Sequence, residues 1–282
     1  MKSYLSLVPI SAKVRKRQNR MTILCVIISI FLVTAIFSVA DMMIRTQSDR
    51  MTGKNGSWHI ELDGISQETA LKIAERDDVV SIGAVTIFNP DGELPYRMDG
   101  KRVVLYGIDE SYLTMNSTGA AEGRFPQGMG EIMLSSNAAR VLQVAVGDTV
   151  TLRTPSGDWD FTVSGLGGVE ESYYSGQYSL MDAYLPRTAF AALMEQNNVH
   201  NLQTSYYVQF TSASKAAKAI PELTAQHNLP ENAVSENTGV MAIAGQSDSS
   251  AAKNVYSLAA VLFVLVLLAG VLMISGSMNS NL

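Results

Sequence analysis

The chain has 282 residues and a formal net charge of −5, with 47% hydrophobic and 17% charged residues. Its single cysteine, Cys25, excludes an internal disulfide framework and a cysteine-based metal cluster. The three histidines, His59, His200 and His227, lie far apart and lack the spacing of a zinc site. The negative charge argues against a general nucleic-acid binder, which needs a basic face to neutralise phosphates.

Two long apolar runs frame the chain. Residues Ile23–Ala40 and Val255–Met278 carry no charged side chain. An α-helix needs about 20 apolar residues to cross the hydrocarbon of a bilayer. Because helices of soluble proteins rarely run this far without a charge, we predict transmembrane helices over residues 21–44 and 255–278.

The charges beside these runs predict the orientation in the membrane. Residues 1–20 hold six basic residues and no acid, whereas residues 45–254 hold fifteen basic and twenty-five acidic residues. Basic residues next to a span stay on the cytoplasmic side. We therefore expect a multi-pass protein of the cell membrane, with residues 1–20 cytoplasmic, residues 45–254 forming an extracytoplasmic domain, and residues 279–282 forming a cytoplasmic stub.

Other interpretations of the N-terminal region stay open. Ser38-Val39-Ala40 is compatible with the cleavage site of a signal peptide, although the apolar run before it is longer than the roughly 7–15 residues of such a signal. Residues 4–10 either lie in the membrane interface as an amphipathic segment or belong to a disordered basic tail. Cys25 is expected to be a small apolar packing residue within the first span.

The extracytoplasmic region begins with alternating strand and helix patterns. Residues 58–62 alternate as a strand, and residues 79–88 and 101–108 have strand-like patterns. Ser66 is placed to cap a helix, and Asn89-Pro90-Asp91-Gly92 is a strong turn. The expected elements are a strand at 58–62, a helix at 67–76, and strands at 79–88 and 101–108.

The next block predicts a mainly β arrangement. We expect Ser135 and Thr188 to cap helices, and residues 155–158 to form a hairpin loop. The glycines of residues 165–168 are expected to end the hairpin as a turn. The expected elements are strands at 131–134, 149–153 and 159–163, a helix from 135 to about 143, a strand edge at 184–186 and a helix at 189–195.

The first pattern then returns, with a strand at 206–210, a helix at 214–226 and a weak strand at 233–240. Strands and helices alternate on both sides of the middle block, which predicts one sheet split in sequence by an inserted lobe at about 109–187. The predicted fold class is therefore α+β: a split βαβ lobe with an inserted mainly-β lobe, between two transmembrane α-helices.

No residue constellation predicts catalysis. The sequence has no GxxxxGK[ST] phosphate loop and no GxSxG nucleophile elbow. The acid pairs Asp77-Asp78, Asp109-Glu110 and Glu170-Glu171 fall at the ends of predicted elements, where solvated charge is the ordinary explanation. The tyrosines of Tyr173–Tyr178 either pack a loop down or contact a partner. We predict no catalytic residue, no cofactor site and no metal site, and therefore no enzyme.

Five short motifs follow one another between the two apolar runs. They are Gly107-Ile108-Asp109, Glu122-Gly123-Arg124-Phe125, Gly130–Ser135, Val146–Val150 and Phe161–Gly165. No single motif is diagnostic. In this order, between two spans of the predicted orientation, they resemble the core domain of the FtsX/MacB-like permeases of ABC transporters, and the resemblance covers essentially the whole chain.

This resemblance implies a βαβ "porter" lobe interrupted by a "sabre" lobe. It also implies a mechanical function, in which a separate ABC ATP-binding subunit closes on the inside and the extracytoplasmic domain moves. Members act in export, peptide resistance, lipoprotein release or activation of cell-wall hydrolases. Such permeases continue into a cytoplasmic loop and further spans where this sequence reaches residues 279–282. The chain is therefore expected to be the N-terminal part of a permease, working with a second copy or with the remaining permease segments.

Two other classes of function are compatible with this plan. A two-span extracytoplasmic sensor would need a long cytoplasmic signalling region after the second span. A membrane-anchored extracytoplasmic enzyme would need the catalytic constellation that the sequence lacks. Gly270 and Gly276, together with nearby alanines and serines, predict a close-packing face on the second apolar helix for another helix, as between two permease copies.

Overall fold

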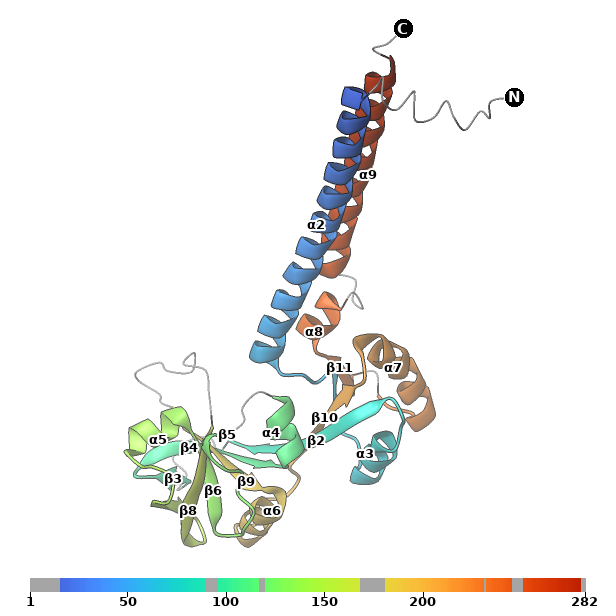
Figure 1. Cartoon of the computed structure of the whole chain (residues 1–282). Helices are drawn as coiled ribbons and strands as arrows, with labels where there is room; N and C mark the ends of the chain where they lie inside the picture. Colours follow the sequence, from blue (N-terminus) through green and yellow to red (C-terminus); the bar gives the residue numbers. More distant parts are fainter. Residues whose placement is uncertain are drawn as a thin grey trace, which may run out of the picture. The chain divides into compact units, whose positions relative to one another are not determined.

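The structure is a computed structural model that describes residues 16–89, 96–116, 120–167, 181–230, 232–244 and 251–279. The chain divides into two compact units, residues 1–49 with 247–282 and residues 50–246. Figure 1 labels the helices and strands of both units. The predicted motifs in Glu170-Glu171, Gly168 and Tyr173–Tyr178 lie outside the described residues.

The first unit contains helix α9 (Ala251–Asn279) and most of helix α2 (Lys16–Asn55). The last turns of α2, residues 50–55, belong to the second unit. Helix α2 is longer than the predicted span, and Ile23–Asn55 is long and apolar enough to cross a membrane. In α9 the stretch Tyr256–Leu272 is a shorter apolar helix. Most large apolar side chains described on both helices are exposed to the surroundings, as expected for helices that meet lipid or another apolar partner.

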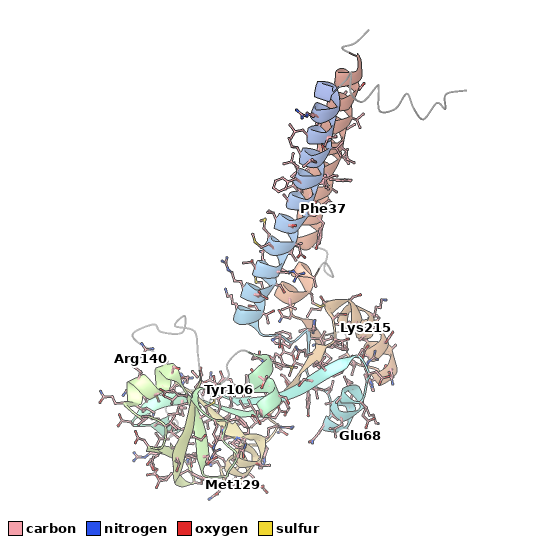
Figure 2. All side chains as sticks on the ribbon, viewed as in Figure 1. Phe37, Glu68, Tyr106, Met129, Arg140 and Lys215 are labelled. Atoms are coloured by element: carbon pink, nitrogen blue, oxygen red, sulfur yellow. The ribbon has the colours of Figure 1, made fainter. Side chains whose placement is uncertain are left out.

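Helices α2 and α9 pack against each other within this unit. The rings of Phe37 (labelled in Figure 2) and Phe263 lie 5.8 Å apart between centroids. A Cβ at Gly270 would lie 3.0 Å from the Ser29 hydroxyl oxygen. The small residue at Gly270 therefore faces another helix, as predicted, and within this chain that helix is α2. For Gly276, the structure describes the helical backbone but not its surroundings.

The second unit is a mixed α/β domain built on one hydrogen-bonded network of eleven strands (Figure 1). The strand order is β11-β1-β10-β2-β4-β3-β7-β8-β6-β9, with β5 paired to β8 and β9 also paired to β4. The strands are β1 (Ile60–Leu62), β2 (Val79–Phe88), β3 (Arg97–Met98), β4 (Lys101–Ile108), β5 (Ala120–Gly123), β6 (Glu131–Ser135), β7 (Thr149–Thr154), β8 (Gly157–Gly167), β9 (Met181–Pro186), β10 (Thr204–Phe210) and β11 (Val234–Glu236). The helices are α3 (Gln67–Ala74), α4 (Glu110–Met115), α5 (Ser136–Leu142), α6 (Arg187–Gln196), α7 (Ala213–His227) and α8 (Thr238–Ile243).

Two hydrophobic cores stabilise the domain. One lies among β3, β4 and the strands from β6 to β9, with α5 and α6, and includes Leu105, Phe161 and Leu193. The other lies between β1, β2 and β10 and helices α3 and α7, and includes Ile73 and Val208. Each fully buried large aliphatic or aromatic side chain contributes about 1.5–3 kcal/mol to folding. A smaller cluster, which includes Ile108 and Leu113, packs under α4.

Several sequence predictions are confirmed residue by residue. Strands β2 and β4 have the predicted bounds. Ser66 caps α3 by accepting a hydrogen bond from the N–H of Thr69 at 3.1 Å. Ser135 caps α5 by accepting one from the N–H of Ala138 at 3.0 Å. The coarse α and β content thus follows from local patterns and caps.

Three local predictions are wrong, each for a tertiary reason. Gly165 does not end the hairpin as a turn. It lies inside β8, where a Cβ would sit 2.4 Å from the carbonyl oxygen of Arg124. Strand β9 is not an edge, because it pairs with β4 in parallel and with β6 in antiparallel fashion. Thr188 does not cap α6, because the helix begins at Arg187, two residues earlier than predicted, directly after Pro186.

The region predicted as a weak strand at 233–240 also differs. Only Val234–Glu236 pair as a strand, against β1. The chain then turns at Asn237 into helix α8. The Asn237-Thr238-Gly239 sequence is typical of a helix start as well as of a turn. In this fold it forms the start of helix α8.

Candidate functional site: the junction of helix α2 with the domain

Helix α2 ends at a glycine turn that is tied to helix α4. Gly56 follows the helix with φ +84°, a conformation that glycine adopts without strain. Its N–H donates to the Thr52 carbonyl at 2.9 Å, and the N–H of Ser57 donates to the Met115 carbonyl at 2.6 Å. A Cβ at position 56 would lie 2.5 Å from that same Met115 oxygen. The positive φ and the close approach both require glycine.

A buried asparagine then joins three separate segments. Asn237 is only 3% exposed, and its Nδ2 donates to the carbonyl of Trp58 at 3.0 Å. Longer contacts of 3.4 and 3.5 Å reach the carbonyls of Asn55 and Gly56. Its Oδ1 accepts from the N–H of Val240 at 3.4 Å, as the N-cap of α8. One amide therefore connects the end of α2, the segment leading into β1 and the start of α8.

Helix α8 is fixed at this point by further contacts. The backbone N–H of Asn237 donates to the carbonyl of His59 at 2.9 Å. A Cβ at Gly239 would lie 2.5 Å from the Nδ2 of Asn55, so the first turn of α8 approaches the last residue of α2 closely. Met241 is fully buried in the core formed with α3 and α7. The segment that leads to α9 is thus anchored in the domain beside the end of α2.

His59 secures the neighbouring strand. It is 8% exposed, and its Nδ1 accepts a hydrogen bond from the N–H of Phe210 at 3.1 Å. Its own N–H donates to the carbonyl of Val208 at 2.9 Å. Burial lowers the pKa of His59, which favours the neutral ring that this acceptor role requires. The histidine is therefore a structural residue of β1 and β10.

Acidic side chains join the first strand to β10, and aromatic packing holds α4 against β10. The Tyr207 hydroxyl donates to Glu61 Oε1 at 2.7 Å, and the Ser205 hydroxyl donates to the Asp63 carboxylate. Tyr112 of α4 packs edge-on against the Tyr207 ring, with centroids 5.1 Å apart. Burial raises the pKa of Glu61 and raises that of Tyr112 to about 12. Helix α4, whose Met115 carbonyl accepts the hydrogen bond from the N–H of Ser57, is in this way joined to β10.

The start of α4 is joined to β2. Asp109 accepts hydrogen bonds from the N–H groups of Tyr112 and Ala84, both at 2.9 Å. Asp109 was predicted to be a solvated charge, and this prediction is wrong, because the carboxylate caps α4 and bridges to the neighbouring strand. A second carboxylate with a shifted pKa lies on β9. Burial raises the pKa of Asp182 to about 6, although a hydrogen bond with Tyr106 acts in the opposite direction and lowers it. Tyr106 is labelled in Figure 2.

The residues of the sequence motifs likewise hold backbone segments together. Glu131 accepts hydrogen bonds from the Arg124 guanidinium at 2.5 and 2.9 Å, and this contact lowers the pKa of Glu131 to about 2. A Cβ at Gly107 would lie 2.4 Å from the Phe190 ring, so glycine lets α6 pack directly on β4. Gly107, Arg124 and Glu131 thus have structural roles in the fold.

The arrangement at the junction is structural. Its polar side chains bind backbone groups of several segments, and its aromatic side chains pack one helix onto the sheet. Among the described residues, no three His, Cys, Asp or Glu side chains form a group that could hold a metal ion. The three histidines lie in separate segments: His59 directly before β1, His200 between α6 and β10, and His227 at the end of α7. That the chain needs no metal and no cofactor stays a prediction.

The junction was not predicted from the sequence. The hydrogen bond of Asn237 to Asn55 joins residues 182 positions apart, and no local pattern reports such a contact. One available signal was Asn237-Thr238-Gly239, typical of an N-cap. The other was Gly56 directly after a long helix, typical of a C-terminal cap.

The family described as MacB-like periplasmic core domain matches residues 21–226. The chain belongs to this family. It is an FtsX/MacB-like ABC transporter permease chain, and such permeases are membrane components that are not themselves enzymes and that work with ABC ATPase partners. No curated protein matches the chain in sequence.

Two solved structures are similar to this chain. The periplasmic region of MacB from Actinobacillus actinomycetemcomitans is 15% identical, with a TM-score of 0.49, and the match covers 70% of this chain and 96% of that one. The extracellular domain of the noncanonic ABC-type transporter YknZ from Gram-positive bacteria is 16% identical, with a TM-score of 0.43, and the match covers 64% and 98%.

Proposed function

We propose that this chain is the N-terminal part of an FtsX/MacB-type permease, in which α2 and α9 cross the membrane and α2 transmits motion to the extracytoplasmic domain. A separate ABC ATP-binding subunit on the cytoplasmic side would drive this motion. A second permease copy or the remaining permease segments would complete the membrane part. The two hydrophobic cores would correspond to the porter and sabre lobes of the family.

One observation carries the proposal. Helix α2 is continuous from Lys16 to Asn55 and ends in the Gly56 and Asn237 junction. Its 40 residues correspond to about 60 Å, twice the roughly 30 Å of bilayer hydrocarbon. A continuous helix transmits tilt or displacement along its length. The buried hydrogen bonds at its end favour movement of the domain with the helix rather than bending at the joint.

The orientation can be tested by cysteine labelling in a Cys25→Ser background. Lys218 lies exposed on α7, so Lys218→Cys should react with a membrane-impermeant maleimide on intact cells. Lys16→Cys should react only after the membrane is permeabilised, because the basic N-terminal segment stays inside. Reaction of Lys16→Cys but not Lys218→Cys on intact cells would overturn the proposed topology.

Coupling can be tested in the assembled transporter in lipid nanodiscs, with the partner ATPase bound. ATP is expected to change hydrogen exchange in the domain, and Asn237→Ala should reduce this change while ATP hydrolysis continues. Asn197→Ala is a matched control, because Asn197 also bonds two backbone groups but lies at the end of α6. An ATP-dependent change that is the same in parent and Asn237→Ala would contradict transmission through the junction.

A further inference from the structure

A groove lies along α6, between this helix, the β2–β10 pair and the start of α3, and has a volume of about 620 Å³. Small-molecule sites have volumes of about 300–1,000 Å³ and are mostly apolar with a few polar groups. Phe190 and Met194 form part of the lining and are 4% and 3% exposed. The half-buried side chains of Val199 and Leu202 lie beside them. The size and the lining are thus those of a ligand site.

Polar groups are placed at particular positions in the groove. Thr86 of β2 and Thr204 of β10 are joined by a hydrogen bond of 2.7 Å between their hydroxyls. Arg187 lies at the first turn of α6 and Glu195 eight residues later, which corresponds to about 12 Å along the helix. The groove therefore has a cation at one end, an anion towards the other, and apolar surface between them.

Arg187 is the group that indicates what the groove binds. Its side chain is half-buried and has no hydrogen bond or ion pair with any residue in the described part of the domain. It also lines a smaller recess of about 90 Å³, together with Gln67 and Asp109. Asp109 is already engaged with two backbone N–H groups. A guanidinium in this position is available for a carboxylate or another planar anion.

The surroundings of Arg187 favour an anion as well. It is the first residue of α6, where the helix dipole is positive, and the N-cap Pro186 supplies no side-chain capping group. Glu195 disfavours a second anionic group at the other end of the groove. Charge complementarity therefore selects a ligand with a single anionic group and an apolar body.

We propose that this groove binds a monoanionic amphipathic small molecule, with its anionic group at Arg187 and its apolar body against Phe190, Met194 and Leu202. The site lies entirely within the extracytoplasmic domain. It does not depend on coupling to an ATPase, so its failure and the failure of the proposed function are distinguishable.

The test uses the full chain in nanodiscs of neutral phosphatidylcholine and the photoreactive probe 4-benzoylbenzoate, which has two aromatic rings and one carboxylate. After irradiation, the adduct is located by peptide mapping. We expect it on residues 187–204, with Met194 the favoured point of reaction because benzophenones attack methionine readily. The neutral analogue 4-benzoylbenzamide should label the same segment at least about tenfold less, because a hydrogen bond to a charged group accounts for about this factor.

Variants separate the site from general apolar binding. Arg187→Gln should reduce labelling by the carboxylate about tenfold and leave the weak labelling by the amide unchanged, which also reports that the groove is still formed. Lys218→Gln removes the same charge from α7 and should have no effect. Ala191→Trp places a large ring on the exposed wall of the groove and should abolish labelling by both probes.

Three results would overturn the proposal. The first is equal labelling of the parent chain by the carboxylate and the amide. The second is an adduct that lies elsewhere in the domain or survives Ala191→Trp. His200 also lines the groove, beside Val199 in sequence. The third result is a loss of labelling in His200→Gln but not in Arg187→Gln, which would place the anion away from Arg187.

Discussion

Replacing Asn237 with alanine should loosen the junction between α2 and the domain. The variant loses the N-cap of α8, which is worth about 1 kcal/mol. It also loses the 3.0 Å hydrogen bond to the Trp58 carbonyl, which is left without this partner in a partly buried site at a cost of about 2 kcal/mol. The free energy of local opening should therefore fall by about 3 kcal/mol.

Hydrogen exchange in the full chain measures this change at the right place. A fall of about 3 kcal/mol corresponds to roughly 100-fold faster exchange of amides that open with the junction. The affected amides should be those of Gly56, Ser57 and residues 238–243, which are hydrogen-bonded at the junction or belong to α8. Strand β7, whose hydrogen bonds lie in the other hydrophobic core, should exchange as in the parent.

Asn197→Ala provides the comparison. Its amide donates to the Leu193 carbonyl at 2.8 Å and accepts from the N–H of Ser156 at 3.0 Å. Its removal should speed exchange near the end of α6 and leave the junction amides unchanged. The reasoning would be refuted if Asn237→Ala left exchange at residues 56–57 and 238–243 within about threefold of the parent, since one lost buried hydrogen bond alone exceeds that factor.

The parts of the fold that were predictable are those fixed by neighbouring residues. Strand β2 is rich in the β-branched residues valine, isoleucine and threonine, and Ser66 and Ser135 stand immediately before short helices as ordinary N-caps. These features depend on residue composition and on local hydrogen bonds. They hold in any tertiary setting that buries the apolar face.

The parts that were missed depend on contacts between distant segments. Helix α4 has only six residues, too few for a periodic pattern, and is fixed by Asp109 and by Tyr112 packing on Tyr207. Gly165 looked like a turn residue because the sequence does not reveal the Arg124 backbone beside it. The ionisation state of a buried carboxylate such as Asp182 is likewise set only by the assembled sheet.

The remaining predictions concern the melting temperature of the full chain, measured by tryptophan fluorescence. Glu131→Gln should lower it at pH 6, and the difference should shrink as pH falls from 4.5 towards 2, because the pKa of Glu131 is lowered from 4.5 to about 2 and its stabilising contribution is lost over that range. Gly165→Ala should lower it, since a Cβ there lies 2.4 Å from a backbone carbonyl oxygen, whereas Gly130→Ala, with nothing within 4 Å, should not. Asp182→Asn should raise it, and the gain should depend on pH. Burial raises the pKa of Asp182 from 3.8 to about 6, so the protonated acid is the form that the fold favours. Its contribution to stability is present below pH 3.8 and is lost as pH rises through 6. Asparagine stays neutral and still offers an oxygen to Tyr106, so it should match the parent at pH 4 and exceed it by about 3 kcal/mol at pH 8, an increase of roughly 6–12 °C. An equal effect of the substitution at both pH values would show that ionisation of this carboxylate does not oppose folding.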